Sequence, residues 1–446
     1  MEISMHTAVF KDGDENIIDE QALFAEDIAG EENEVINLYP EMAYETFEGF
    51  GGAITDAAGY VYAQMNEIQK KEVIDTYFNP EKMNYTLVRI QMDSCDFSTG
   101  LYEAVSDEND REMKSFSFER TEKYIMPMLK DAAAAAGKPL TLMLSPWSPP
   151  EFMKTNGERC HGGKLKKEYR KWWAEYICRY ITEFENRGFK VSRISLQNEP
   201  KAVQTWDSCV YSAEEEKEFL RDFMYPTLKE KGLDHVKIFI WDHNKERVFE
   251  RARDIIDETT DPMVAGIAFH WYSGDHFEAL DLVREKFPGK QLLLSESCLE
   301  YTKFDKNMAG RQGFRLAHEV IGDLNHGMTA FHDWNILLDE EGGPNHVGNF
   351  CHAPFLYDRK TKKLMRQTTQ TFFYMFSHYI VPGSVRIAFS KYTGDIEMSA
   401  YKTPQGEIIV ILLNCTEKDY PVNFRLNGKV VKVISRAGSI AAAELM

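Results

Sequence analysis

The chain has 446 residues, of which 43% are hydrophobic and 13% aromatic, which is enough apolar material for a large core and excludes wholesale disorder. Its formal net charge of −19 at pH 7 argues against a phosphate backbone as partner, so we expect no nucleic acid to bind. No stretch approaches the ~20 apolar residues that cross a bilayer, so we expect no membrane span.

The cysteines and the first residues predict a cytoplasmic protein. Seven cysteines are scattered from Cys95 to Cys415 without a Cys-x-x-Cys pair, which favours reduced thiols over a disulfide framework. The stretch from Met1 to His6 contains neither the basic region nor the apolar core of a secretory signal. The sequence gives no information on oligomeric state.

Short apolar runs alternate with helical patterns over residues 46–381. The runs that look like buried parallel strands are Phe47–Ile54, Tyr85–Met92, Leu140–Leu144, Val191–Leu196, Val236–Trp241, Val264–Trp271, Gln291–Leu294 and Met328–Trp334. The helical patterns are Val61–Phe78, Phe118–Ala136, Lys167–Asn186, Ala213–Lys231, Lys245–Thr259, His276–Phe287, Asn307–Asn325 and Gln367–Tyr379. Eight strand–helix units predict an α/β fold with a closed (β/α)8 TIM barrel, whose active site lies at the carboxyl ends of its strands.

The two ends of the chain have a different pattern. After about Pro382, strand-like segments are separated by turn signals such as Asn427-Gly428, which is typical of a tight hairpin. Residues 1–45 also contain short alternating stretches and are too few to fold alone. We therefore expect residues 1–45 and 382–446 to form one side β-sandwich built from both chain termini. Its predicted strands are Glu2–Phe10, Glu34–Leu38, Ile396–Tyr401, Glu407–Leu413, Val422–Leu426 and Val430–Ile434.

Two glutamates stand where predicted strands end. Glu199 lies in Asn198-Glu199-Pro200, and Glu296 follows Leu292–Ser295. Each could be a polar stop at a strand end, but Pro200 biases Glu199 away from the α region and makes this motif more restrictive. Two carboxylates that face one pocket are the minimum for breaking a glycosidic bond, one as acid/base and one as nucleophile. The sequence therefore predicts a glycoside hydrolase.

The other strand ends carry carboxylates, amides and indoles, which fit a sugar: short polar groups bond hydroxyls and aromatic faces pack on C–H surfaces. They include Asp56, Asp93–Asp96, Trp147, Asp242, His270–Tyr272 and Asp333–Asn335.

Three competing sites are disfavoured. Gly49-Phe50-Gly51-Gly52 has no following Lys-Ser/Thr, so it is not expected to hold a nucleotide. His270, His332, His346 and His352 lack metal-ligand spacing, so we expect no metal and no cofactor. Cys298 has no evident activating base.

The strand-end motifs, in their order along the chain, resemble glycoside hydrolase family 30, whose best-known members are the lysosomal glucosylceramidases. The resemblance runs from about Gly49 to Phe350, and the flanking all-β segments are similar to the family's side sandwich. It rests on Gly49–Ala57, Ser145–Pro150 with Met153–Gly157, Asn198–Pro200, His270–Tyr272, Ser295–Cys298, and Asp333–Asn335 with Gly342–Asn345.

The resemblance implies a retaining mechanism in which Glu199 is the acid/base and Glu296 the nucleophile. It also implies that Asn198 bonds the sugar 2-hydroxyl and that Tyr272 lies beside the nucleophile. The remaining hydroxyls of a gluco-configured sugar are then held by Asp56, Trp147, Trp334 and Asn349. We expect the pocket to keep Glu199 protonated by disfavouring its charge.

Two segments depart from the glucosylceramidase pattern: the loop Lys201–Tyr211, and His346, which stands where those enzymes carry an aromatic residue. Both should face the leaving group, so we expect an exo-acting β-glucosidase on a short β-glucoside or small oligosaccharide rather than on ceramide. The alternatives are a β-xylosidase or β-fucosidase of the same family, an endo-acting β-1,6-glucanase with Trp206 and Trp271 as aromatic platforms, and a non-catalytic glycan-binding protein.

Overall fold

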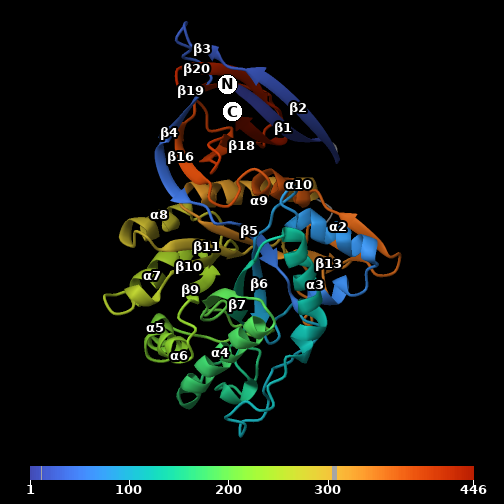
Figure 1. The fold of residues 1–446 in the computed structure, drawn as a ribbon, viewed down its shortest axis with the longest axis vertical. Helices are drawn as coiled ribbons and strands as arrows, with labels where there is room; N and C mark the ends of the chain where they lie inside the picture. The colour runs from blue at the N-terminus through green and yellow to red at the C-terminus, as the bar shows by residue number, and fades with distance from the viewer. Residues whose placement is uncertain (12, 304–308) are drawn as a thin grey trace.

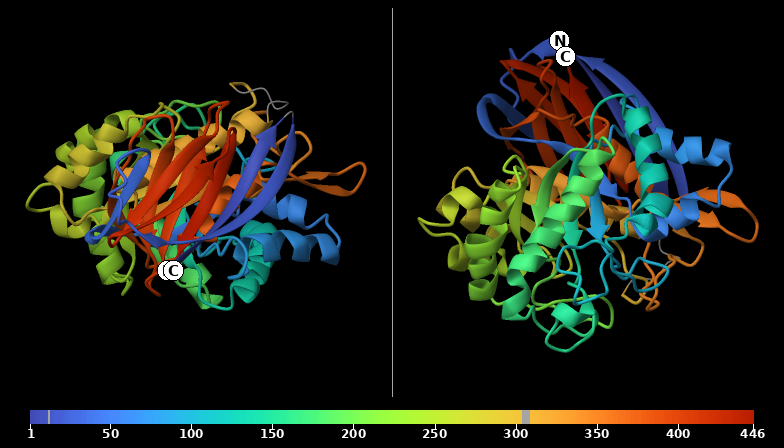
Figure 2. Two further views of the ribbon diagram at one scale, coloured as in Figure 1. Left: turned by 90° about the horizontal axis from the view of Figure 1, so that it is seen from above. Right: turned by 60° about the horizontal axis from the view of Figure 1, so that its bottom comes forward.

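The computed structural model describes residues 1–11, 13–303 and 309–446. Figure 1 shows a β-sandwich at the top and a barrel below it, with helices α9 (Ala309–Asn325) and α10 (Thr369–Ser377) between them. Both chain termini lie in the sandwich (Figures 1 and 2). Within the described residues, no helix is both long and apolar enough to span a bilayer.

Eight parallel strands close into a barrel in chain order, with the last strand paired to the first. The predicted barrel is therefore confirmed. Glu199 follows its fourth strand and Glu296 ends its seventh. The strands are β5 (Gly49–Ala53), β6 (Leu87–Met92), β7 (Thr141–Pro146), β8 (Val191–Ser195), β9 (Lys237–Asn244), β10 (Gly266–His270), β11 (Gln291–Glu296) and β12 (Ala330–Asn335).

The interior of the barrel is layered. Its apolar layer contains Leu87, Met143, Phe239, Ala268, Leu293 and Ala330. Because side chains alternate along a strand, residues two positions further on face the same way, which places Arg89, Ser145 and Ser295 in the next layer. The barrel thus changes from apolar packing to a buried polar layer toward the carboxyl ends of its strands.

In the described part of the chain, eight further helices and several single turns surround the barrel, and some are shorter than predicted. The predicted helix Val61–Phe78 is divided because Asn66 caps a new helix, its side chain bonding the backbone of Gln69 and that of Gln69 bonding back. Asn307 lies outside the described residues, so only the part of its predicted helix from Ala309 is seen. The helices are α1 (Asp56–Tyr62), α2 (Glu67–Phe78), α3 (Glu119–Ala136), α4 (Arg170–Asn186), α5 (Ala213–Phe219) with a π turn into α6 (Tyr225–Glu230), α7 (Val248–Ile255) and α8 (Phe277–Lys286).

The sandwich combines strands from both chain termini, as predicted. Its ten strands are hydrogen-bonded in one continuous sheet. β21 (Ser439–Leu445) lies between β1 (Glu2–Lys11) and β18 (Ile408–Asn414), and side chains from all three share one apolar core. The other strands are β2 (Asp14–Leu23), β3 (Ala25–Glu26), β4 (Val35–Thr46), β16 (Val385–Ser390), β17 (Glu397–Lys402), β19 (Tyr420–Leu426) and β20 (Lys429–Ser435). A separate small sheet contains β13 (Leu337–Asp339), β14 (Phe355–Asp358) and β15 (Lys363–Arg366).

Candidate active site

A pocket of about 220 Å³ lies at the carboxyl ends of the barrel strands. Its inner wall is buried and includes Asp96, Phe97, Trp147 and Trp334, whereas Gln204, Trp206, Asn244, Glu300 and Lys303 form a more exposed mouth. Eight of the nine residues predicted for the site line this pocket: Trp147, Asn198, Glu199, Trp206, Tyr272, Glu296, Trp334 and Asn349.

Glu199 is held by unusual backbone geometry. Its φ is 46°, and its backbone N–H donates to the carbonyl of Asp242 at 2.9 Å. Trp241 and Asp242 also have positive φ values, 74° and 52°. Non-glycine residues rarely adopt this conformation, and such strain concentrates at functional sites. The turn after β8 and the end of β9 therefore fix each other beside the pocket.

Glu296 is held at both carboxylate oxygens. The Arg89 guanidinium donates to Oε2 at 2.6 Å, and the Tyr272 hydroxyl donates to Oε1 at 2.9 Å. Arg89 also donates to Oδ1 of Asn198 at 2.9 Å. This bond orients the Asn198 amide, whose nitrogen can then donate to a ligand.

Asp242 and His270 form a buried pair behind the two glutamates. Both side chains are fully buried, and Nε2 of His270 lies 3.1 Å from Oδ1 of Asp242. Although burial opposes it, the Arg89 charge holds the pKa of Asp242 well below its usual value. Burial would lower the pKa of His270, but Glu296, Asp242 and Glu199 together raise it to about 9.

The pKa values of the two glutamates in the empty pocket differ from our expectation. Burial alone would raise the pKa of Glu199, but His243 and His270 face its carboxylate at 3.9 and 3.4 Å and lower the pKa to about 2. Burial raises the pKa of Glu296 above its usual value against the opposing charges of His270 and Arg89. The expectation that the pocket alone keeps Glu199 protonated is therefore wrong, because it overlooked the two imidazoles.

Asp56 lies outside the pocket. Its carboxylate accepts from Arg120 at 2.8 and 2.9 Å and from the backbone N–H of Thr99 at 3.1 Å. The side chain that the structure places on the inner wall is Asp96, four residues after the end of β6. Burial raises the pKa of Asp96 well above its usual value, and Asn345 donates to its Oδ2 at 3.1 Å. Asp93–Asp96 was among the strand-end groups expected to fit a sugar, but the sugar contact was assigned to Asp56 and not to Asp96.

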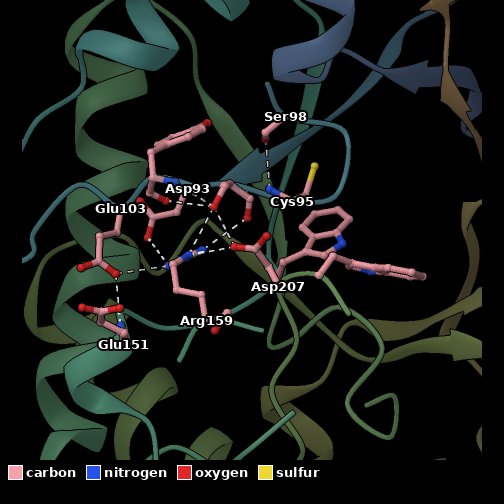
Figure 3. A network of polar contacts seen from close by, with 12 residues as sticks. Asp93, Cys95, Ser98, Glu103, Glu151, Arg159 and Asp207 are labelled. Atoms are coloured by element: carbon pink, nitrogen blue, oxygen red, sulfur yellow. Dashed lines mark hydrogen bonds and ion pairs between the residues drawn. The ribbon is translucent and has the colours of Figure 1, made fainter. Parts of the chain in front are cut away.

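The mouth loop that carries Gln204 and Trp206 is anchored by a buried ionic network (Figure 3). Arg159 donates to Oδ1 of Asp207 at 2.8 Å and lies 3.5 Å from Asp93 and 3.7 Å from Glu103. The second oxygen of Asp207 lies 3.2 Å from Nε2 of His346, so this network joins the two segments that depart from the glucosylceramidase pattern.

Trp271 is not an aromatic platform. Its side chain is 4% exposed, and its indole N–H donates to the carbonyl of Cys298 at 3.1 Å. Cys298 lines the pocket, and burial raises the pKa of its thiol well above the usual value, so it is a poor nucleophile. The described residues contain no group of three or more His, Cys, Asp or Glu side chains arranged to hold a metal ion.

The fold and the paired carboxylates define a glycoside hydrolase, and the chain belongs to glycosyl hydrolase family 30. The model of the family's TIM-barrel domain matches residues 47–381, and that of its β-sandwich domain matches residues 383–442. The chain is therefore an O-glycosyl hydrolase, as predicted.

Known relatives cover most of the chain. Lysosomal acid glucosylceramidase of Mus musculus is 28% identical over 87% of this chain and 78% of its own length. Endo-1,6-beta-D-glucanase of Neurospora crassa is 24% identical over 70% of this chain and 64% of its own length. The crystal structure of SrfJ from Salmonella typhimurium is 34% identical, covers 99% of both chains and has a TM-score of 0.95.

Proposed function

We propose that this protein is a retaining, exo-acting β-glucosidase in which Glu199 is the acid/base and Glu296 the nucleophile. The observation that carries the proposal is that both carboxylates face one imidazole nitrogen: Nδ1 of His270 lies 3.4 Å from Oε1 of Glu199 and 3.9 Å from Oε1 of Glu296. Retaining enzymes hold their carboxyl groups about 5–5.5 Å apart, whereas inverting enzymes need ~6.5–9.5 Å for a water molecule. A shared contact favours the short separation.

The contacts of Glu296 suit a nucleophile. Arg89 and Tyr272 fix its carboxylate and stabilise its charge until one oxygen bonds the anomeric carbon. In the same step Glu199 protonates the departing glycosidic oxygen, and in the second step it removes a proton from the attacking water. The free amide nitrogen of Asn198 is available to the 2-hydroxyl.

The difference in burial along the pocket supports exo action on a single glucosyl unit. The inner end is closed by buried side chains, so a chain of sugars has no path beyond it. Glucose as the glycone is supported by the mouse relative, which is named a glucosylceramidase.

At the mouth, the Glu300–Lys303 ion pair and Gln204 favour a polar leaving group over the apolar chains of ceramide. The predicted cytoplasmic location is in keeping with small, water-soluble glucosides.

An endo-acting β-1,6-glucanase is the second candidate. It is favoured by Trp206 at the mouth, where an indole can stack on a further sugar, and by the Neurospora crassa relative. The test is a panel of 4-nitrophenyl β-glycosides followed by β-linked disaccharides, β-1,6-glucan and glucosylceramide. We expect the β-glucoside to be the best aryl substrate and glucose the only early product. Long oligosaccharides from β-1,6-glucan would favour endo action, and no turnover of any β-glycoside would leave only glycan binding.

A further inference from the structure

The surroundings of Glu199 in the empty pocket do not favour the protonated form that a general acid needs. His243 and His270 favour the ionised form of Glu199, yet a general acid must carry a proton when the bond breaks. We propose that His270 stores this proton, which moves between Nδ1 of His270 and Oε1 of Glu199. The proposal rests on the role of Glu199 as acid/base.

The other side of the imidazole is fixed. Asp242 is an ionised acceptor, because Arg89 donates to its Oδ2 at 2.8 Å and the Ser295 hydroxyl donates to its Oδ1 at 2.5 Å. Nε2 of His270, 3.1 Å from the same Oδ1, must therefore carry a hydrogen and donate it. Only Nδ1 remains free to gain or lose a proton, which is the arrangement of a histidine oriented by a carboxylate.

Nδ1 points at the acid/base and at the nucleophile. Among the described residues it has no hydrogen-bond partner of good geometry, although it is fully buried. The oxygens that face it are Oε1 of Glu199 at 3.4 Å and Oε1 of Glu296 at 3.9 Å. The Glu296 oxygen already accepts from Tyr272, so Glu199 is the closer and less occupied partner.

The transfer leaves the net charge of the site unchanged. Moving the proton from His270 to Glu199 converts an ion pair into two neutral groups. Bound substrate excludes water from Glu199, which destabilises the ion pair and sends the proton to the carboxylate. The charged or titratable groups that face His270 are Asp242, Glu199, Glu296, the Arg89 bound to two of them, His243 and Tyr272.

The catalytic cycle balances. In the first step the O–H bond of Glu199 breaks as the glycosidic oxygen gains the proton. In the same step Glu296 bonds the anomeric carbon, the bond between that carbon and the glycosidic oxygen breaks, and the leaving group departs as a neutral alcohol. In the second step water gives a proton to Glu199 while its oxygen displaces Glu296. The proton on Glu199 then returns to Nδ1 of His270, and the starting state is restored.

The test compares leaving groups in His270→Gln, since glutamine can still donate to Asp242 but cannot take up a proton. The kcat/KM for phenyl β-glucoside, which needs the acid, should fall about 100-fold. The kcat/KM for 2,4-dinitrophenyl β-glucoside, which does not, should fall less than about fivefold. In the unmodified enzyme, kcat/KM for the phenyl substrate should fall as pH rises through about 9. In the variant, this basic limb of the pH profile should begin at a pH lower by at least about two units.

His352→Gln is the matched control, because His352 is a buried histidine bonded to Thr369 and has no contact with either glutamate in the described structure. This substitution should not change the ratio of kcat/KM between the phenyl and the 2,4-dinitrophenyl substrate. Equal losses on both substrates in His270→Gln, with the basic limb unmoved, would show that His270 only shapes the site and would overturn the proposal. An unmodified protein that cleaves no β-glucoside would instead overturn the proposed function.

A second measurement does not depend on activity. In ¹⁵N-histidine NMR of the unmodified protein, His270 should titrate near its raised pKa of about 9. In Glu199→Gln, which removes the negative partner, its pKa should fall by about one unit or more. An unchanged pKa in this variant would contradict proton sharing, even if His270→Gln failed to fold.

Discussion

The indole rings of Trp147 and Trp334 stack with their centroids 5.2 Å apart and 21° between their planes. Trp147 directly follows the third barrel strand, and Trp334 is the last residue but one of the eighth. The Arg89 guanidinium lies 4.9 and 5.3 Å from the two ring centroids. The arginine that holds the nucleophile is therefore packed against the inner wall of the sugar pocket. The side chains that line the sugar pocket and the arginine that positions Glu296 therefore support each other.

The first prediction concerns the hydroxymethyl arm of the sugar. Asn349 and Asp96 both line the pocket, and the Asn349 side chain helps to lower the pKa of Asp96 against the effect of burial, so we expect this pair to hold the 6-hydroxyl. An aryl β-xyloside lacks that arm and should be cleaved about 100-fold less efficiently than the β-glucoside, since an unmet buried polar pair costs about 3 kcal/mol. Asn349→Ala should narrow this gap mainly by lowering kcat/KM for the glucoside. Equal or better cleavage of the xyloside by the unmodified protein would favour the β-xylosidase alternative.

The second prediction separates the two glutamates. Glu296→Ala should abolish turnover of all substrates, whereas Glu199→Ala should retain the first step for 2,4-dinitrophenyl β-glucoside, which needs no protonation. Azide should restore turnover of Glu199→Ala and give a β-glycosyl azide, identified by NMR. A β-glycosyl azide formed by Glu296→Ala instead would reverse the assignment.

The third prediction concerns stability against pH. His318 on α9 lies 2.7 Å from Glu397 on β17 and 3.3 Å from Asp275, and the bond from Glu397 raises the pKa of His318 to about 9. Protonated His318 therefore stabilises the folded state. This contribution is complete below the pKa of about 6.5 that a histidine has in the unfolded chain, and it is lost as pH rises through about 9. His318→Gln should therefore lower Tm at pH 6 and leave it nearly unchanged at pH 10.

The matched background for this prediction is Glu397→Gln, which removes the main partner of His318. In that background the His318→Gln substitution should have a much smaller effect at pH 6. An equal loss of Tm at both pH values in the otherwise unmodified protein would contradict an electrostatic contact between barrel and sandwich.

The fourth prediction concerns the network beneath the mouth loop. Arg159→Met leaves Asp93 and Asp207 buried without their cation, which typically costs about 3–5 kcal/mol. Arg179→Met, which removes a partly exposed ion pair with Glu183 and a contact over the Phe116 ring, should cost less than about 1 kcal/mol. Urea unfolding measures both. A cost for Arg159→Met as small as that of the control would mean that the network does not stabilise the mouth loop.

The barrel was predictable because its signal is local: each buried strand is a short apolar run, and eight of them occurred in alternation with helices. Four strands of the sandwich, β2, β3, β16 and β21, were not predicted. The Ala-rich sequence of β21 has little strand preference of its own, and its conformation follows from pairing on both sides with β1 and β18. The division of the Val61–Phe78 pattern could have been predicted, because Asn66 and Gln69 have the spacing of a capping box.

The pocket was predictable to a similar extent. Residues at strand ends converge in a barrel whatever the details of packing, and six of the eight predicted side chains that line the pocket stand at strand ends. The other two, Trp206 and Asn349, lie in loops, and Asn349 was predicted from the family resemblance. Asp56 and Asp96 both follow strands, and only packing decides that Arg120 takes the first and the pocket the second. The low pKa of Glu199 was equally out of reach, because His243 comes from β9 and His270 from β10.

The most direct test of the account is the stereochemistry of the first product. ¹H NMR of a 4-nitrophenyl β-glucoside digest, recorded before mutarotation, identifies the anomer of glucose that the enzyme releases. The double displacement through Glu296 predicts β-glucose first, with α-glucose appearing only as the sugar equilibrates. Initial release of α-glucose would show a single displacement by water and would contradict the assignment of Glu296 as nucleophile.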